Sequence, residues 1–449
     1  MIFAIDKDTI FGKEMPKALV KLCGIPLLER NLHLLRSIGI RDVSIVTGYK
    51  GTMIEDYFKD GRDWGLKIEY FQDFNFKMED ISSKGGEKDG DGGFMVLFGS
   101  DVFDVRILKE LSTRGGMTYC YDSNPEHSDK AVKVLVENDR VRGIGKDLQN
   151  WTGVYVGICV LDYGAFPILK DCGDSNWIEC LDKITERLEV HPFDISEIPT
   201  YVAGLKRSLK PVWFSIGTRE DLVRCKRLLI GRSQKGVHFA AYYNKPIEDK
   251  VVEYICEYPW ITPNRLTIIS NAFAYFVTFL FLKGYLLAAS TSTFVVSIMD
   301  GLDGKLARAR GTTTKLGSIE HSFDLLFEQS WWIAFSLAIF FDTGSWLPLG
   351  LCLGILLMDT FVRHVYMQFK AVMEIPLTDY ARFDRAFAKI DGRRNVYIIY
   401  ILLGVISGKP LYSLFAILGH ATLTAVVYAY RAMKHIHDAD KRARLLLQD

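Results

Sequence analysis

The stretch MDGLDGKLAR (residues 299–308) ends one apolar run of the chain, and the stretch GSIEHSFD (residues 317–324) opens the next one. Each stretch holds two acids, three residues apart in the first and four apart in the second. Residues at these spacings share one face of a helix, so each pair of carboxylates is expected to project from one side of its helix. The four acids are Asp300, Asp303, Glu320 and Asp324.

Four carboxylates at membrane depth cannot stay ionised without a counter-charge, and ionisable groups inside a membrane usually mark a functional site. One or two hard divalent cations with oxygen ligands would supply that charge, and such ions typically hold phosphate groups. Gly304 and Gly317 would let the backbone or a ligand approach closely, because glycine has no Cβ. In the alternative interpretation the acids lie at the interface and pair with Lys305, Arg308 and Arg310. The helical spacing of all four acids favours the metal site.

Apolar runs recur along residues 264–430 and predict a helical membrane domain. Basic residues cluster after every second run, whereas the other connections carry only Lys283 and Lys409. Because Lys and Arg are enriched in cytoplasmic loops, this pattern predicts six spans with both termini in the cytoplasm. Some runs are shorter than the roughly 20 residues that cross a bilayer, so polar residues are expected to extend those helices. The six runs are 266–282, 284–299, 325–341, 345–361, 396–408 and 411–430.

The first 230 residues have the pattern of a soluble α/β domain. Short β-rich runs such as 44–47, 94–98 and 155–161 alternate with helical patterns such as 26–38, which predicts a mainly parallel sheet with helices on both faces. The N-terminus lacks the features of a signal peptide, and the eight scattered cysteines fit a reducing compartment. A net charge of +1 argues against a general nucleic-acid binder.

The two acidic stretches resemble the signature of the CDP-alcohol phosphotransferase family, D-x2-D-G-x2-A-R, about eight residues, then G-x3-D-x3-D. Residues 263–267, PNRLT, are similar to the P-N-x2-T entry to the first span of that family. The second half departs from the pattern, because Glu320 replaces an Asp and lies one residue closer to Gly317. The run EHSFD resembles the D-H-G-x-D form of some members, so Glu320 and Asp324 are assigned as the third and fourth acids. The matching positions are Asp300, Asp303, Gly304, Ala307, Arg308 and Gly317.

This resemblance implies an all-α membrane domain that uses a divalent metal, Mg²⁺ or in second place Mn²⁺, held by the four acids. Asp324 would also take a proton from an acceptor hydroxyl, whose attack on the β-phosphorus of a CDP-alcohol releases CMP and leaves a phosphodiester. The alcohol and the acceptor stay open between inositol, glycerol and lipid chemistry, and a homodimer in the bilayer is expected. Arg382, Arg393 and Arg394 are candidates to clamp an acceptor phosphate, or only set the topology. The implied substrate-contacting positions of the signature are Gly304, Ala307, Arg308 and Gly317.

Residues 1–232 resemble sugar-phosphate nucleotidyltransferases, an α/β family with a Rossmann-like fold. The stretches MPKAL (15–19), GSD (99–101) and WFSIGTREDL (213–222) are similar to three elements of that family, including the aspartate that binds metal. The stretch RGIGKDL (142–148) looks closest to the inositol-1-phosphate cytidylyltransferase branch. That branch occurs fused to a CDP-alcohol phosphotransferase that makes di-myo-inositol phosphate phosphate. The positions that correspond to its catalytic remnant are Lys17, Asp101 and Lys146.

The catalytic pattern of this nucleotidyltransferase-like domain is damaged. The opening loop of the family, A-A-G-x-G-T-R-L, corresponds to AIDKDTIF (residues 4–11), where Asp6 and Asp8 replace both glycines and Ile10 replaces the arginine. Side chains there would strain a tight phosphate loop, and two carboxylates would repel phosphate. Ser215 stands where the family has its second metal-binding aspartate. These changes predict a domain that is inactive or strongly impaired.

Three hypotheses follow from these patterns. The first is a membrane CDP-alcohol phosphotransferase whose inactive N-terminal domain serves as a scaffold, dimerisation or regulatory module. The second is a bifunctional enzyme that both makes and uses a CDP-alcohol such as CDP-inositol. The third is a non-catalytic membrane scaffold that retains two old folds. The expected domains are 1–232, a connector with an interfacial helix at 233–262, the membrane domain at 263–436 and a cytoplasmic tail at 437–449.

If the loop at residues 6–11 cannot hold a triphosphate, CTP should not raise the melting temperature of the N-terminal domain. A ligand at a hundred times its dissociation constant would add about 2.7 kcal/mol, which thermal unfolding detects easily. Gly at positions 6 and 8, Arg at 10 and Asp at 215 should together restore some stabilisation by CTP. Saturable stabilisation of the unaltered domain, with formation of pyrophosphate, would show that the domain is active.

Overall fold

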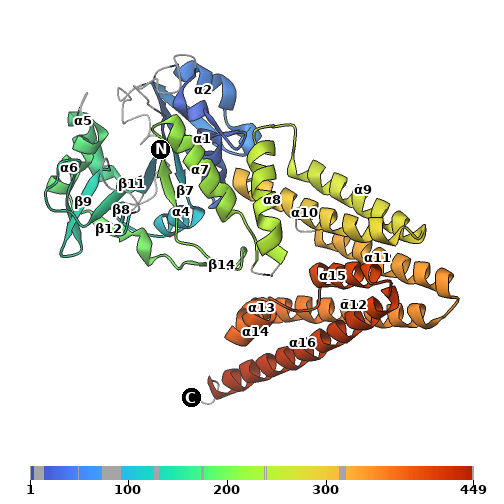
Figure 1. Cartoon of the computed structure of the whole chain (residues 1–449). Helices are drawn as coiled ribbons and strands as arrows, with labels where there is room; N and C mark the ends of the chain where they lie inside the picture. The colour runs from blue at the N-terminus through green and yellow to red at the C-terminus, as the bar shows by residue number, and fades with distance from the viewer. Residues whose placement is uncertain are drawn as a thin grey trace. The chain divides into compact units, whose positions relative to one another are not determined.

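The structure is a computed structural model of the chain, and it describes residues 2–446 except 5–14, 49, 73–92, 126–130, 173–175, 237, 239 and 313–319. The chain forms two compact units, which are coloured from blue to green and from green to red in Figure 1. The first, here called the α/β unit, comprises Met1–Val202, Ser208–Arg232 and Ala309–Thr312. The second, here called the helical unit, comprises Ala203–Arg207, Ser233–Arg308 and Thr313–Asp449.

A mixed sheet forms the centre of the α/β unit, with the strand order β10-β9-β11-β6-β1-β4-β5 and with β8 and β12 beside β11. The strands β5, β4, β1 and β6 are parallel, as expected, whereas β11 runs antiparallel to β6, β8 and β9, so the sheet is less parallel than the sequence predicts. The three expected strands are confirmed in β4, β6 and β11. The bounds are β1 Ile2–Ala4, β4 Asp42–Thr47, β5 Lys67–Gln72, β6 Gly93–Phe98, β8 Thr118–Asp122, β9 Lys133–Glu137, β10 Arg140–Gly145, β11 Gly153–Asp162 and β12 His191–Asp194.

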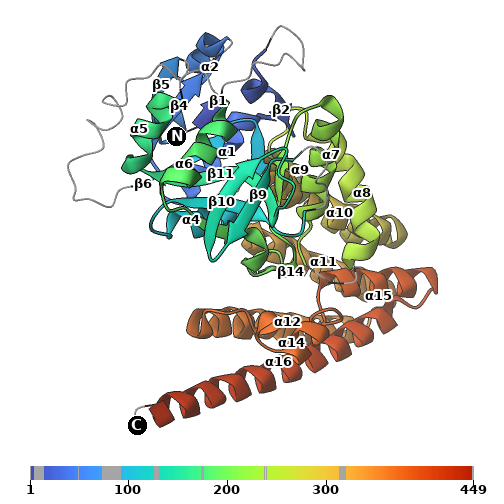
Figure 2. The same cartoon turned by 90° about the vertical axis from the view of Figure 1, so that its left-hand side faces the viewer.

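Helices cover both faces of this sheet, as the sequence predicts. Successive side chains of a strand point to opposite faces, and in β4 Ile45 packs into one buried cluster while Val46 packs into another. The first cluster includes α1 (Leu27–Ser37), α2 (Gly51–Phe58) and α4 (Val105–Ser112). The second includes α5 (Phe166–Asp171) and α6 (Trp177–Arg187), and Figure 2 shows α6 beside β10. The remaining elements are β2 Lys21–Leu22, β3 Ile25–Pro26, β7 Asp101–Phe103, β13 Tyr201–Val202, β14 Arg207–Ser208, β15 Trp213–Ser215 and α7 Arg219–Arg232.

The helical unit consists of long helices around a core rich in aromatic residues, among them Trp331, Trp332 and Phe335. Thr262 caps the first of the apolar helices by accepting a hydrogen bond from the backbone of Arg265, and Pro263 occupies the first turn. The six expected apolar runs fall on six separate helices, α9, α10, α11, α12, α15 and α16. The bounds are α8 Ala240–Ile255, α9 Pro263–Leu282, α10 Leu286–Arg310, α11 Glu320–Thr343, α12 Leu347–Met373, α13 Leu377–Tyr380, α14 Arg382–Phe387, α15 Arg394–Ile406 and α16 Pro410–Leu446.

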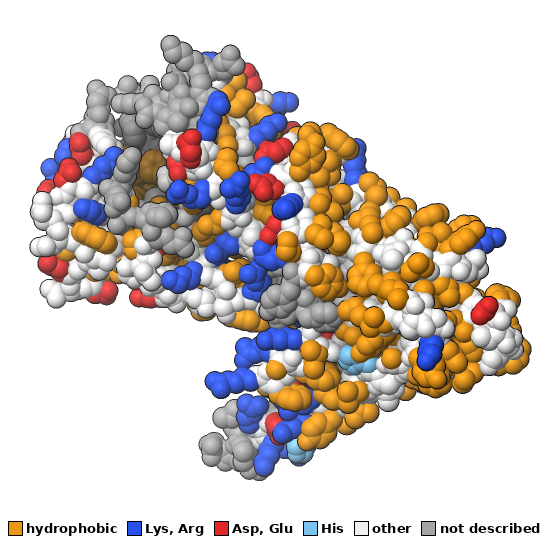
Figure 3. Space-filling model, in the orientation of Figure 1, with side chains coloured by type: hydrophobic (Ala, Val, Ile, Leu, Met, Phe, Trp, Pro, Cys, Tyr) orange, Lys and Arg blue, Asp and Glu red, His pale blue; other side chains and the backbone are white. Residues whose placement is uncertain are grey.

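Within the described residues, three helical segments are long and apolar enough to cross a membrane: Pro263–Leu282, Leu347–Met373 and Pro410–Arg444. The helix α15 is apolar but shorter, and α10 and α11, on which two of the expected runs fall, are not among these segments. Large hydrophobic side chains are exposed on these helices, and Figure 3 shows how densely they cover this part of the chain. Ile268, Phe341 and Leu353 are each at least 69% exposed, as expected for side chains that face lipid.

All eight cysteines are buried, as the sequence predicts for structural thiols. In the α/β unit, burial raises the pKa of Cys159 and of Cys225 to about 12, whereas an unfolded thiol has a pKa of about 8.5. The raised pKa stabilises the fold below about pH 8.5, and this contribution is lost as the pH rises towards 12.

The free energy of unfolding of the α/β unit should therefore fall between about pH 8.5 and 10.5, by up to about 1.4 kcal/mol per pH unit for each buried thiol. Urea unfolding followed by tryptophan fluorescence measures it. The Cys159→Ala/Cys225→Ala variant should show a shallower pH dependence. If the free energy of unfolding of that variant falls with pH as steeply as that of the parent, the pH dependence does not come from these two thiols.

Candidate functional site

The two acids of α10 lie on one side of the helix, as their spacing predicts. Asp303 is 3% exposed, and its Oδ2 accepts a hydrogen bond of 2.5 Å from the hydroxyl of Thr267 on α9. Thr267 is the last residue of the PNRLT stretch, so the two sequence motifs meet in the fold. Asp300 forms an ion pair with Arg394, the first residue of α15.

The second acidic stretch begins the helix α11. Its first residue is Glu320, whose side chain is outside the described part of the chain, as is the whole of Gly317. Asp324 is buried, and Glu328 one turn later is also buried. Glu328 lies 3.2 Å from Arg394 and also pairs with Arg363 of α12. Arg394 therefore joins Glu328 to Asp300.

Sequence analysis missed Glu328, Asp359 and Arg363. Nε of Arg363 donates to Oδ2 of Asp359 at 3.1 Å, so the ion pairs form a chain from α12 through Glu328 and Arg394 to Asp300. Two signals were present: Glu328 continues the four-residue spacing of Glu320 and Asp324, and Asp359 and Arg363 are four apart on an apolar helix. Buried charges are costly unless paired, so this chain of contacts stabilises acids that would otherwise repel one another.

The other predicted contact residues lie in different surroundings. Arg393 is ion-paired with Asp391, and Arg382 is exposed at the start of α14. Nε of Arg308 donates to the backbone oxygen of Ser233 at 2.6 Å. Ala307 is buried, and a Cβ at Gly304 would lie 2.8 Å from the guanidinium of Arg308, so glycine leaves room for that side chain.

The donor set of this region fits a hard divalent cation, because it consists of carboxylate and hydroxyl oxygens. Asp300, Asp303 and Asp324 are the described acids of the two stretches, and Arg394 supplies the counter-charge at Asp300. Among the described residues, no group of three or more His, Cys, Asp or Glu side chains is arranged as a metal site.

In the α/β unit, Asp101 and Ser215 lie side by side. Asp101 of β7 pairs in register with Ser215 of β15, and the hydroxyl of Ser215 donates to Oδ1 of Asp101 at 2.8 Å. The structure thus brings Ser215 next to Asp101, while the replacement of an aspartate at position 215 stays a prediction from the sequence. Lys17 is half-buried in a short helical turn, and Lys146 is exposed just after β10. The loop that contains Asp6, Asp8 and Ile10 is outside the described residues.

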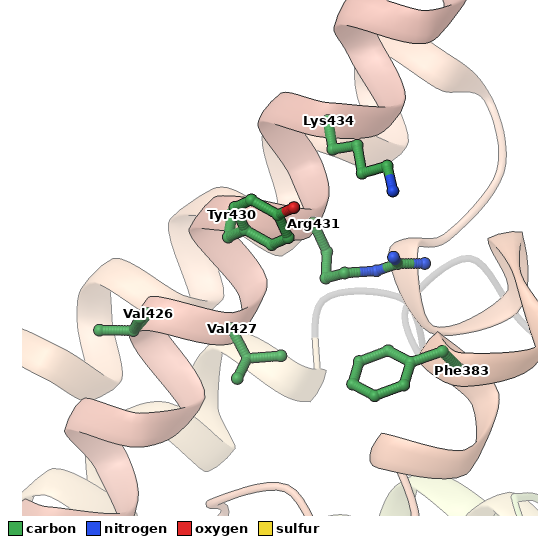
Figure 4. Close-up of a pocket in the computed structure, with 6 residues that line it drawn as sticks. All are labelled: Phe383, Val426, Val427, Tyr430, Arg431 and Lys434. Atoms are coloured by element: carbon green, nitrogen blue, oxygen red, sulfur yellow. The ribbon is translucent and has the colours of Figure 1, made fainter.

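A pocket of about 380 Å³ is lined by residues of α14 and α16 (Figure 4). Its floor is apolar, with Phe383, Val426 and Val427, and its rim carries Arg431 and Lys434. The guanidinium of Arg431 is already held by the buried carboxylate of Asp384, at 2.6 and 3.1 Å. That pairing explains the position of Arg431 without a ligand.

Comparison with known proteins agrees with the resemblance found in the sequence. Residues 260–427 match the CDP-alcohol phosphatidyltransferase family, so the resemblance of the C-terminal region is confirmed. A bifunctional IPC transferase and DIPP synthase of Archaeoglobus fulgidus is 26% identical over 93% of this chain and 81% of its own length. The protein of the same name from Thermococcus kodakarensis is 29% identical over 71% of this chain and 70% of its own length.

Solved structures also align with the N-terminal half. The inositol-1-phosphate CTP transferase of T. maritima is 17% identical, with a TM-score of 0.37, over 49% of this chain and 89% of its own. A putative glucose-1-phosphate thymidylyltransferase of Bacillus anthracis is 16% identical, with a TM-score of 0.40, over 51% of this chain and 93% of its own.

The series of ion pairs from Asp359 to Asp300 leads to a prediction about stability. Arg363→Met should destabilise the helical unit by on the order of 3 kcal/mol, because it leaves Glu328 and Asp359 buried with less counter-charge. Thermal unfolding in detergent measures this change, and Arg382→Met, which removes an exposed arginine, should leave the melting temperature unchanged. Equal melting temperatures for the two variants would contradict the structural role of Arg363.

Proposed function

We propose that this chain is an integral membrane transferase that moves a phospho-alcohol group from a CDP-alcohol to an acceptor hydroxyl and releases CMP. The observation that supports this most is the cluster of buried carboxylates on α10 and α11, within the region that matches the CDP-alcohol phosphatidyltransferase family. The proposed topology has six spans and both termini in the cytoplasm, and the proposed domains are those expected from the sequence.

In this proposal Asp300, Asp303 and Glu320 hold a divalent metal, with Mg²⁺ preferred. When bound, the metal would neutralise the diphosphate of the donor and stabilise the charge that develops on it. The Thr267 hydroxyl orients Asp303, and Arg394 shields Asp300 from the acids of α11. These contacts orient the two carboxylates and supply a positive charge next to Asp300.

Asp324 is proposed to accept the proton of the acceptor hydroxyl. The acceptor oxygen then forms a bond with the β-phosphorus, the bond from that phosphorus to the bridging oxygen breaks, and CMP leaves with the electron pair. The products are a phosphodiester, CMP and one proton. An acceptor phosphate could bind Arg382, which is exposed, whereas at Arg393 or Arg394 it would have to displace a carboxylate. The proposed acceptors are an inositol phosphate or a lipid, and a homodimer is proposed.

A second candidate is the bifunctional enzyme that also makes its CDP-alcohol. The named activities of the relatives from Archaeoglobus and Thermococcus favour it. The replacement of an aspartate by Ser215 opposite Asp101 argues against it, because a hydroxyl is a weaker ligand for Mg²⁺ than a carboxylate. Formation of pyrophosphate from CTP and inositol phosphate by the full-length protein would decide for the bifunctional enzyme.

Asp300→Asn and Asp303→Asn should each lower CMP release by at least a thousandfold, because each removes a proposed metal ligand, while membrane insertion is kept. Asp324→Asn should lower kcat strongly with little change in donor affinity. Membranes that contain the protein, supplied with labelled CDP-alcohols and candidate acceptors, provide the assay. Full activity of either α10 variant would rule out the metal assignment. A parallel loss of donor affinity in Asp324→Asn would make this residue a metal ligand rather than the base.

A further inference from the structure

The helix α10 has a second polar face besides the face that carries Asp300 and Asp303. Ser297, Gly301 and Lys305 follow one another at four-residue intervals and therefore share one side of the helix. This side packs against α8, the helix that precedes the first apolar helix. The proposed function assigns no role to this contact.

Asn244 and Glu248 bring α8 close to α10. Nδ2 of Asn244 donates to the hydroxyl of Ser297 at 3.2 Å. One turn later on both helices, a Cβ at Gly301 would lie only 2.5 Å from the carboxylate oxygen of Glu248. Because glycine has no Cβ, the Glu248 carboxylate can lie against α10 here, whereas a side chain at position 301 would require that carboxylate to shift.

Lys305 completes this contact and is only 1% exposed. Its Nζ donates to Oε1 of Gln234 at 2.6 Å, lies 3.4 Å from Oε2 of Glu248 and pairs with Asp249. Asp249 also pairs with Lys245 on the exposed side of α8, so two bases balance two acids. A buried lysine is costly unless it is paired in this way.

We propose that this contact is a latch that fixes the rotation of α10, with Lys305 and Glu248 as positioning residues for Asp300 and Asp303. The latch rests on the proposed function of those acids, and neither of its residues touches a substrate. A displacement of about 1 Å at reacting groups can lower a rate about a hundredfold. A rotation of α10 would displace Asp300 and Asp303, so the contact that fixes this rotation affects turnover. Gln234 lies just after the end of α7, so the segment that leaves the α/β unit forms part of the latch.

The first experiment removes the latch and keeps the charge balance. In Lys305→Met/Glu248→Met, the pair Lys245–Asp249 remains, and the new side chains fill a similar volume. In full-length protein in nanodiscs, kcat should fall at least tenfold, while the melting temperature stays near that of the parent. Lys250→Met, which changes an exposed residue of α8, should leave both quantities unchanged. A parental kcat in the double variant would overturn the proposal.

A disulfide tests whether the effect is positional. The substitutions Asn244→Cys and Ser297→Cys are added to the Lys305→Met/Glu248→Met variant. The new disulfide joins α8 to α10 where the side chains of residues 244 and 297 already meet. Oxidation should restore most of the turnover, and reduction should remove it again. If the oxidised protein stays as slow as the reduced protein, the latch does not act by position.

Hydrogen exchange provides a readout that does not depend on activity or on the survival of the double variant. Glu248→Gln should make the backbone amides of residues 297–306 exchange several-fold faster, and unchanged exchange would overturn the latch. The two proposals can fail separately. If the parent protein releases no CMP from any CDP-alcohol, the proposed function is wrong, but faster exchange in Glu248→Gln than in the parent would still support the latch.

Discussion

The ion pairs of Arg394 with Asp300 and with Glu328 are the contacts on which the helical unit depends most. Helices that pack in lipid gain little from apolar burial against one another, so polar contacts determine much of their arrangement. Here one guanidinium links α10, α11 and α15, and Arg363 extends the linkage to α12. The acids proposed to act in catalysis are therefore also structural members of the fold.

The helix α10 has polar contacts on two sides. One side carries Asp300 and Asp303, held by Arg394 and Thr267, and the other side receives α8 at Gly301 and Lys305. A helix with polar contacts on two sides has few positions at which a residue could change without loss. Lys305, which the sequence suggests as a simple partner for nearby acids, instead pairs with acids of another helix.

The α/β unit has a sheet that is covered by helices on both faces. The pairing of β7 with β15 places Ser215 opposite Asp101, and the replacement of a carboxylate by this serine stays a prediction from the sequence. The fold depends on apolar positions spread over many strands and helices, so it tolerates a change at one polar position. Activity depends on a few polar groups at fixed distances, and one substitution is enough to alter it.

The sequence by itself predicted an α/β half and a helical half, the strands β4, β6 and β11 and the helices on which the six apolar runs fall, and it singled out four acids. These are local properties, because hydrophobic periodicity and residue spacing set the faces of a helix or strand within a few residues. It did not determine the partners of those acids. Thr267, Glu328, Arg363 and Glu248 are brought to the signature only when α8, α9, α11 and α12 pack around α10. Charge pairing between distant helices is a property of that packing, since any of several bases could have balanced these acids and only the tertiary structure selects which of them does.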